Sequence, residues 1–227
     1  MLEFSNVGAS YAGLAALKGV TLQVAAGERL AVFGHNGAGK TTLLKCAVGD
    51  HDAITGEVRF HGEPIIPGQV FRNVRRGIGF VPQGHNVFRE LSVEQNLSIA
   101  GLLHDPRAIS QVFELFPILS ERRRQVAGSL SGGQQQMLAL GMALMTKPAI
   151  LLLDEPTTGL APIIAANVLR GLQTINQSMG TAIVIVEQNV PVTLKSVDRA
   201  VILKSGSIVF DGTAKRLAAE PDLWAWF

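Results

Sequence analysis

Two short apolar segments in the second half of the chain lack the alternation of a half-exposed strand. Residues 149–153 and 181–186 are almost continuous runs of Ile, Leu, Val and Ala. Runs of this length, rich in branched residues, are typical of central parallel strands that are buried on both faces. A third apolar segment, 78–81, stops at Pro82 and is also predicted as a strand. Because apolar residues recur at helical spacing over 162–178, the pattern indicates an α/β core with a parallel sheet.

The N-terminal region shows a different pattern. Residues 2–4, 20–24 and 28–33 alternate and turn like strands of an antiparallel sheet, and a further strand is expected at 56–61. A helix is predicted at 40–48, directly after a glycine-rich segment. The sequence therefore predicts an N-terminal antiparallel β-subdomain joined to the parallel core.

The middle of the chain, 84–140, has helical spacing, with breaks expected at Gly101, Pro106, Pro117 and Gly128. Near the end, segments 200–203 and 207–210 flank Lys204-Ser205-Gly206 and predict a hairpin. Trp224 and Trp226 are expected to pack on the core or on a partner.

We therefore expect one domain over residues 1–227. Its catalytic core, which includes the antiparallel β-subdomain, would comprise 1–83 and 147–227, and 84–146 would form an inserted helical subdomain.

Composition limits the possible classes of protein. Hydrophobic residues make up 47% of the 227 residues and charged residues 17%, so much of the chain must be buried in a core or against partners. The net charge of +2 is too small to indicate nucleic-acid binding through bulk charge. The single cysteine, Cys46, permits no internal disulfide and fits a reducing compartment.

No segment approaches the ~20 apolar residues of a membrane helix, so a role at a membrane would require a partner. The basic run 122–124 is interpreted as a solvated face, with phosphate or lipid binding as the alternative.

Residues 34–41 fit the pattern G-x-x-x-x-G-K-[ST] between a predicted strand and a predicted helix. Glycines let backbone N–H groups surround phosphate oxygens, and the following helix directs its positive end at them. Lys40 would reach the β- and γ-phosphates, and the Thr41 hydroxyl would ligate Mg²⁺. A glycine-rich turn without function is the alternative, and the strand–loop–helix context argues against it.

Two acids, Asp154 and Glu155, end the apolar segment 150–153. An aspartate at this place can hold Mg²⁺, and the neighbouring glutamate can act as general base or orient a water in line with the γ-phosphate. Acidic strand ends are common, so this interpretation depends on the phosphate loop upstream.

A second glycine-containing helix start follows at Ser131-Gly132-Gly133, with Ser131 placed as the N-cap. Such a start can bind an anion by the same physics as the phosphate loop. With one phosphate loop in the chain, this second site would serve a nucleotide held by another copy or a partner. A simple capped helix is the alternative.

These three motifs, in this order, resemble the ATP-binding cassette (ABC) ATPases, whose signature is the Leu-Ser-Gly-Gly-Gln of residues 130–134. The resemblance covers essentially the whole chain. It implies a P-loop NTPase (RecA-like) fold and a head-to-tail pair of cassettes with two ATP molecules between them. The residues that it implies for ATP binding are Tyr11, Gly34, His35, Asn36, Gly37, Ala38, Gly39, Lys40, Thr41, Thr42, Ser131, Gly132, Gly133 and Gln134.

The resemblance also assigns catalytic and metal-binding roles. Tyr11 would stack on adenine, with packing at a strand end as the alternative. Gln83 matches the glutamine that senses Mg²⁺ and the attacking water and links to the membrane subunit. Glu155, Gln188 and Gln83 are the implied catalytic residues, and Thr41, Gln83 and Asp154 are the implied Mg²⁺ ligands.

Further motifs resemble the second ATPase of branched-chain amino acid importers. They are Val81-Pro82-Gln83-Gly84, Glu114-Leu115-Phe116-Pro117, Gln135-Gln136-Met137-Leu138-Ala139, Gly159-Leu160-Ala161-Pro162 and Val186-Glu187-Gln188-Asn189. The resemblance implies an ATPase that energises uptake of branched-chain amino acids or a related small solute. Relatives of this subgroup move urea or short amides, and these motifs do not separate the substrates. The subgroup implies two membrane permeases, a sister ATPase in a heterodimer (with a homodimer as the alternative) and an extracytoplasmic solute-binding protein. It implies a peripheral position on the cytoplasmic face of the bacterial inner membrane and no nucleic-acid partner.

Three positions depart from the pattern of many cassettes. Gln188 replaces a histidine that contacts the γ-phosphate, and glutamine cannot carry a proton near neutral pH. Ala161 replaces an aspartate in the loop that crosses to the other subunit, and Met142 replaces an arginine. The closer subgroup shares the Gln and Ala residues, so they do not indicate an inactive enzyme, but they would allow the two ATP sites of a heterodimer to be unequal. The alternatives to a transport ATPase are a soluble cassette in DNA repair, translation or cluster assembly, and a regulatory subunit with little catalysis.

Overall fold

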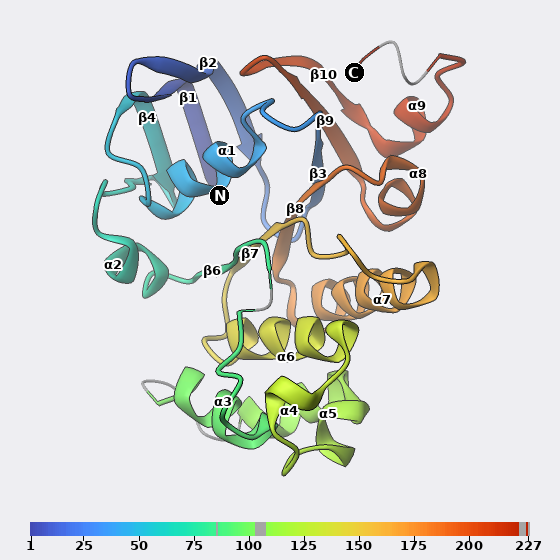
Figure 1. The fold of residues 1–227 in the computed structure, drawn as a ribbon. Coiled ribbons are helices and arrows are strands. Elements are labelled where there is room, and N and C mark those ends of the chain that lie inside the picture. The colour runs from blue at the N-terminus through green and yellow to red at the C-terminus, as the bar shows by residue number, and fades with distance from the viewer. Residues whose placement is uncertain (85, 103–107, 223–225, 227) are drawn as a thin grey trace.

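The computed structural model describes residues 1–84, 86–102, 108–222 and 226 (Figure 1). The strands are β1 (Leu2–Tyr11), β2 (Leu14–Val24), β3 (Arg29–Phe33), β4 (Ile54–Phe60), β5 (Glu63–Pro64), β6 (Ile78–Val81), β7 (Ile150–Asp154), β8 (Ala182–Glu187), β9 (Arg199–Lys204) and β10 (Ser207–Thr213). The α-helices are α1 (Lys40–Val48), α2 (Val70–Val74), α3 (Val93–Ala100), α4 (Ala108–Leu115), α5 (Pro117–Glu121), α6 (Gly132–Leu144), α7 (Pro162–Met179), α8 (Val190–Thr193) and α9 (Ala214–Ala218).

The described strands form two sheets. One is antiparallel, with the order β2-β1-β4-β5, and the other has the order β10-β9-β3-β8-β7-β6. Strands β9, β3, β8, β7 and β6 of the second sheet are parallel, and β10 adds an antiparallel edge through the predicted hairpin. This arrangement confirms the expected α/β fold with a parallel core and an N-terminal antiparallel sheet.

The prediction for residues 28–33 was wrong in one respect. This segment was assigned to the antiparallel sheet, but β3 pairs in parallel with β8 and β9 at the centre of the other sheet. All four residues from Leu30 to Phe33 are buried. A strand with both faces covered is the type found in parallel sheets, and the burial of Ala31 and Phe33 as well as Leu30 and Val32 is the physical reason for the difference.

The N-terminal hairpin is longer than its hydrophobic pattern suggests. Strands β1 and β2 extend well beyond the predicted segments 2–4 and 20–24. Their pairing contains register shifts, one of them between Phe4 and Val7 beside Asn6, whose φ is 51°. Such irregularities interrupt the alternation of inward and outward side chains, and therefore hide a strand from a period-two search.

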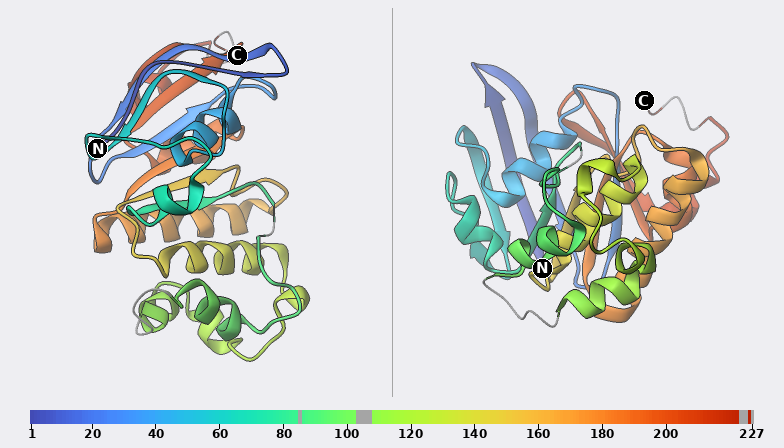
Figure 2. Two further views of the ribbon diagram at one scale, coloured as in Figure 1. Left: turned by 90° about the vertical axis from the view of Figure 1, so that its left-hand side faces the viewer. Right: turned by 60° about the horizontal axis from the view of Figure 1, so that its bottom comes forward.

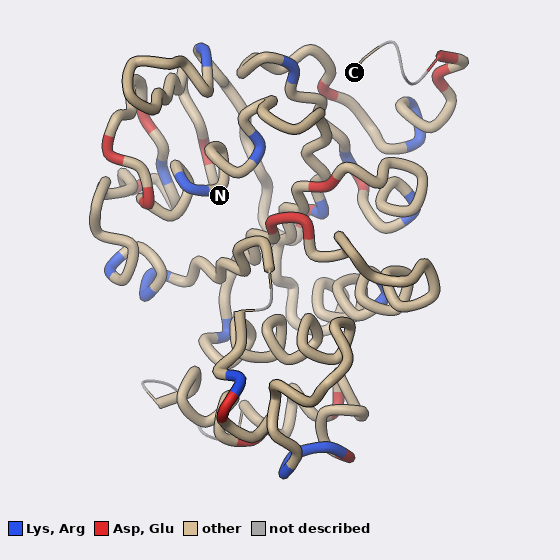
Figure 3. The backbone as a smooth tube through the Cα atoms, viewed as in Figure 1, with Lys and Arg blue, Asp and Glu red and all other residues tan. Residues whose placement is uncertain are grey.

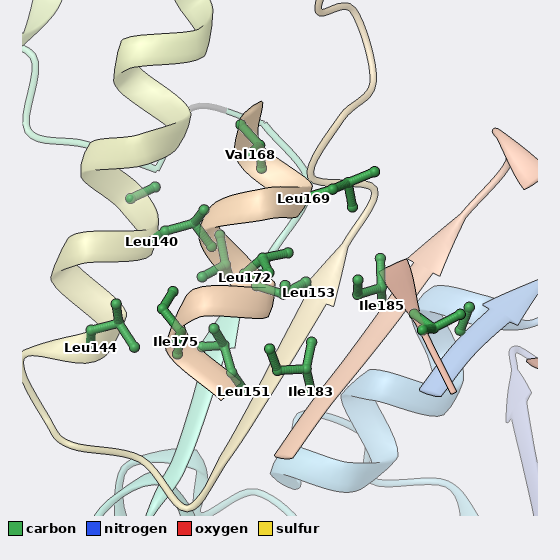
Figure 4. Close-up of a cluster of buried hydrophobic side chains, with 14 of the residues drawn as sticks. Leu140, Leu144, Leu151, Leu153, Val168, Leu169, Leu172, Ile175, Ile183 and Ile185 are labelled. Carbon is green, nitrogen blue, oxygen red and sulfur yellow. The ribbon is translucent and has the colours of Figure 1, made fainter. Parts of the chain in front are cut away.

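Alternate residues of the parallel strands enter two different cores. Val184 and Val186 of β8 belong to a buried cluster with α1 and the antiparallel sheet, whereas Ile183 and Ile185 face α6 and α7. Figure 4 shows Ile183 and Ile185 beside Leu151 and Leu153 of β7, with side chains of α6 and α7 around them. Each fully buried aliphatic side chain stabilises the folded state by roughly 1.5–3 kcal/mol. The central strands are buried on both faces, so burial on both sides stabilises their pairing.

Helices α3–α7 form layers on one side of the parallel sheet, and α1 lies on the other side, next to the antiparallel sheet. In Figures 1 and 2, α6 and α7 lie against the sheet, and α3, α4 and α5 form an outer layer beyond α6. The expected break at Gly101 follows the end of α3, while Pro106 lies outside the described residues. The break expected at Pro117 is confirmed, because α4 ends at Leu115 and Pro117 begins α5, where the missing N–H of proline is not needed.

Two smaller expectations can be compared with the fold. Trp226 packs edge-on against Phe210 of β10, with ring centroids 5.4 Å apart, and Trp224 lies outside the described residues. Charged residues are absent from α6 and otherwise lie in the sheets, the loops and other helices (Figure 3), and 122–124 lie exposed after α5. Within residues 1–84, 86–102, 108–222 and 226, no helix is long and apolar enough to cross a bilayer.

The central strands give a direct test of the core. Leu151 is completely buried in β7, so Leu151→Ala should lower the free energy of unfolding by about 2–5 kcal/mol through lost burial and a residual cavity. Chemical denaturation monitored by circular dichroism measures this change. The control is Leu102→Ala, because Leu102 is 75% exposed, and we expect an effect within about 0.5 kcal/mol. Equal effects of the two substitutions would contradict the described packing.

Candidate functional site

The phosphate-loop motif connects β3 to α1, as the sequence predicts. Gly39 precedes α1 with a φ of 105°, and a Cβ there would lie 2.5 Å from the carbonyl oxygen of Ala16. Only glycine meets both conditions. The loop therefore closes tightly onto β2 and presents the first N–H groups of α1 to a possible anion.

Lys40 is held at the centre of this loop. Its side chain is 5% exposed, and Nζ donates to the carbonyl oxygens of Gly34 at 2.8 Å and His35 at 3.2 Å. Nζ also lies 3.6 Å from Oε1 of Glu155, which is 7% exposed. A buried ammonium group requires such partners, because an uncompensated charge away from water is strongly destabilising.

Glu155 is the point where the predicted catalytic side chains meet. Its Oε2 accepts a hydrogen bond from Nε2 of Gln83 at 2.9 Å, and its Oε1 accepts one from Nε2 of Gln188 at 2.7 Å. The Thr158 hydroxyl lies 3.2 Å from Oε2. The same Gln188 amide donates to Oδ1 of Asn36 in the phosphate loop at 2.8 Å. The structure thus brings Gln83, Glu155 and Gln188 together from three separate segments.

Asp154 and Thr41 lie together at the same edge of the sheet. Asp154 is buried at the end of β7, close to the Thr41 side chain. Burial raises the pKa of Asp154 above its usual value. Its Oδ1 is buried and makes no hydrogen bond to any residue of the described ranges. A buried, incompletely satisfied carboxylate beside a hydroxyl is a donor set that suits Mg²⁺.

A cavity of about 420 Å³ is lined by seven of the fourteen predicted nucleotide-binding residues, and Gly34, His35, Ala38 and the signature residues are not among them. Tyr11 at its rim is 47% exposed, and its ring packs edge-on against His51 with centroids 4.6 Å apart. An exposed aromatic ring at the mouth of a phosphate site is available for stacking. The cavity is lined by Tyr11, Leu14, Ala15, Ala16, Asn36, Gly37, Gly39, Lys40, Thr41, Thr42, Gln83 and Glu155.

The signature segment lies at the start of α6, outside the lining of this cavity. Ser131 is the N-cap, and its side chain accepts a hydrogen bond from the N–H of Gln134, whose own side chain accepts one from the Ser131 N–H. This reciprocal cap confirms the predicted helix start. Gly133 also has a packing reason to be glycine, since a Cβ there would clash with Ile164 of α7. Met142, further along α6, packs against the core that lies between the parallel sheet and helices α6 and α7.

Two contacts near the site were not expected from the sequence. Glu187, at the end of β8, is 1% exposed, and its Oε1 accepts hydrogen bonds from the N–H and hydroxyl of Thr157 at 2.9 and 2.6 Å. Burial raises the pKa of Glu187. The sequence did contain a signal for Glu187, because it is a charged residue at the end of an otherwise apolar segment. His51 behind Tyr11 gave no signal, because no local pattern relates the two residues.

A glycine-rich loop between a parallel strand and a helix, with a buried lysine, a threonine and an acidic pair from a nearby strand, defines a P-loop nucleoside triphosphatase. Comparison with known proteins narrows this class. The family profile "ABC transporter" matches residues 17–158, and the chain belongs to this family.

Several relatives match nearly the whole chain. The high-affinity branched-chain amino acid transport ATP-binding protein BraG of Pseudomonas aeruginosa is 42% identical, with 97% of this chain and 96% of BraG covered. The probable branched-chain amino acid transport ATP-binding protein LivF of Archaeoglobus fulgidus is 36% identical, with 96% and 94% covered. The solved structure of cbiO1 from Clostridium perfringens, part of the ABC transporter complex cbiONQ, superimposes with a TM-score of 0.89 at 25% identity, covering 98% and 92%.

The chain is thus the ATP-binding and ATP-hydrolysing subunit of an ABC transporter. Cassettes of this family dimerise and act with membrane permease components.

The position of Tyr11 generates a prediction about base binding. Tyr11→Ala should weaken ATP binding by roughly 1–3 kcal/mol, the range for removing an aromatic ring that stacks on a base. Tyr11→Phe is the matched control and should bind ATP like the unchanged protein, because it keeps the ring. Titration calorimetry with ATP measures both variants. Unchanged affinity of Tyr11→Ala would leave Tyr11 with a packing role only.

Proposed function

We propose that the chain hydrolyses ATP with Glu155 as the group that activates or orients the attacking water. The arrangement around Glu155 is the observation that carries this proposal: both carboxylate oxygens are already held by Gln83 and Gln188, 3.6 Å from Lys40. A carboxylate fixed in this way can accept a proton at a defined point beside the γ-phosphate.

Lys40 would change partners when ATP binds. Its ammonium group now contacts the carbonyl oxygens of Gly34 and His35 and lies near Glu155. Phosphate oxygens would take over these interactions, since they carry more charge than the loop carbonyls. This exchange would release Glu155 from Lys40. The N–H of the Gln188 amide that now donates to Asn36 would turn to the γ-phosphate, while its other N–H stays on Glu155.

Thr41 and Asp154 would hold Mg²⁺, with Gln83 as a third candidate ligand. The orphaned Oδ1 of Asp154 and the adjacent Thr41 hydroxyl support this assignment. When bound, Mg²⁺ neutralises charge that develops on the β- and γ-phosphates. Gln83 would offer its amide oxygen to the metal, while its amide nitrogen keeps donating to the Glu155 carboxylate.

Ser131, Gly132, Gly133 and Gln134 would act on the nucleotide of a second cassette. They lie at the start of α6, away from the Lys40 cavity, and the capping box uses the N–H groups of Ser131 and Gln134 but not those of Gly132 and Gly133, which would face a nucleotide held by a partner. Gln188 and Ala161, which depart from the family's usual residues, support a heterodimer with a sister ATPase and two unequal ATP sites. A homodimer is the alternative.

For the transported solute we propose branched-chain amino acids. The two relatives described above carry this solute in their names and match the chain over more than nine-tenths of its length. The chain would work with two permeases at the cytoplasmic face of a bacterial inner membrane and, indirectly, with an extracytoplasmic solute-binding protein. Urea or short amides are the alternative cargo.

The catalytic proposal is tested by Glu155→Gln in the assembled transporter. The amide cannot accept the proton, so ATP turnover should fall by about 10²–10⁴-fold while ATP binding is retained. Phosphate release measures turnover, and exposed Glu121→Gln serves as the control that should hydrolyse ATP normally. Unchanged turnover in Glu155→Gln would overturn the assigned role.

The cargo proposal is tested by transport. The chain would be reconstituted with two permeases, a sister ATPase and a solute-binding protein sought among its neighbouring genes. Uptake of labelled leucine, isoleucine and valine would then be compared with uptake of urea and acetamide. We expect ATP-dependent uptake of the amino acids. Uptake of urea or acetamide alone would replace the solute and keep the transport function. Co-purification with nucleic acid or ribosomes, and with no membrane protein, would contradict a transport role.

A further inference from the structure

Glu187 is a buried acid outside the cavity of the nucleotide site. It ends β8 at 1% exposure, and no lysine, arginine or histidine of residues 1–84, 86–102, 108–222 and 226 forms an ion pair with it. Its carboxylate instead accepts three hydrogen bonds, from the N–H and hydroxyl of Thr157 and from the N–H of Gln188 at 3.2 Å. Burying an acid in this way costs free energy that an apolar residue would not, so packing alone does not account for it.

The three hydrogen bonds connect the two loops that meet at the catalytic carboxylate. Thr157 belongs to the loop that follows β7 and begins with Glu155, and Gln188 begins the loop that follows β8. Across the same gap, the Gln188 amide donates to Glu155 at 2.7 Å. Glu187 therefore fixes the backbone on both sides of the contact between Gln188 and Glu155.

The backbone of Glu155 needs such support. Its φ is 48°, in the left-handed region that non-glycine residues avoid. Strained backbone of this kind persists only where the surroundings determine it. The Glu155 N–H donates to the carbonyl of Val186 at 2.9 Å on one side, and Thr157 is anchored to Glu187 on the other. Loss of the Thr157 anchor would leave the turn free to relax and to move the carboxylate.

We propose that Glu187 is a positioning residue for ATP hydrolysis, which clamps Thr157 and the Gln188 backbone and so sets the position of Glu155 relative to Gln188. The inference rests on the proposed role of Glu155. Since Glu187 does not line the nucleotide cavity, its loss should affect the chemical step and leave ATP binding intact.

The test uses Glu187→Gln in the assembled transporter. The amide nitrogen would face an N–H of Thr157 or Gln188, donor against donor, so the clamp is lost while the shape is kept. We expect kcat to fall by about 10–100-fold, the effect of a small misplacement of a catalytic group, with KM for ATP unchanged. An unchanged kcat, or an equal change in KM with kcat retained, would overturn the proposal.

Thr157 supplies a second set of variants, which decides the matter even if Glu187→Gln fails to fold. Thr157→Val has nearly the same shape and lacks the hydroxyl donor, so kcat should fall. Thr157→Ser keeps both donors and should restore turnover. In the double variant of Glu187→Gln and Thr157→Val, the losses should not multiply, because both remove the same interaction. If Thr157→Val kept the kcat of the unchanged protein, the proposed positioning role of Glu187 would be wrong.

Glu155→Gln separates this inference from the proposed function. If Glu155→Gln leaves turnover unchanged, the proposed catalytic role fails and the clamp fails with it. If Glu155→Gln abolishes turnover and Glu187→Gln does not reduce kcat, the clamp alone is wrong.

Discussion

Parallel pairing of β3, β8 and β7 is the constraint on which the site depends. Phe33 of β3 pairs with Glu187 of β8, and Val186 pairs with Asp154 of β7, so the three strands end at the same edge of the sheet. The phosphate loop, the acidic pair and Gln188 each follow one of these strand ends. Their convergence is therefore a property of strand register, since residues more than a hundred positions apart meet only if the strands pair in this order. A shift of one residue would also turn the side chains of a strand to the other core.

Buried polar groups at this edge satisfy one another in a connected network. Lys40, Glu155 and Glu187 are all nearly inaccessible to water, and each has partners within hydrogen-bonding or ion-pair distance. Removal of one member leaves its partner buried and unsatisfied, which costs more than the bond itself contributes. Asp154 differs from these residues, because its buried Oδ1 has no hydrogen-bond partner among the described residues. This unsatisfied oxygen is the structural reason to propose a cation there. The same network explains how the left-handed backbone of Glu155 is maintained at the end of an otherwise regular strand.

Much of this site was predictable, because its elements are local. The phosphate loop, the acids after β7 and the cap at Ser131 are short patterns whose chemistry follows from spacing, and the strand at 78–81 was predicted with its observed bounds. The assignment of β3 to the wrong sheet has a different origin, since pairing partners are set by tertiary packing that a single strand does not encode. The contact of Tyr11 with His51 and the clamp of Thr157 by Glu187 join residues distant in sequence and belong to no motif. The helical layer was foreseen as helical, but the role of Pro117 as a helix start required the geometry of its first turn.

The central claim is that Gln83 and Gln188 act through one carboxylate, that of Glu155. Single-turnover cleavage of ATP by the assembled transporter tests this most directly, in four forms: unchanged, Gln83→Ala, Gln188→Ala and the double variant. If both glutamines position the same carboxylate, the double variant should cleave ATP about as slowly as the slower single variant, because residues that act as a unit are not additive. Losses that multiply in the double variant would show two independent contributions and would contradict the account.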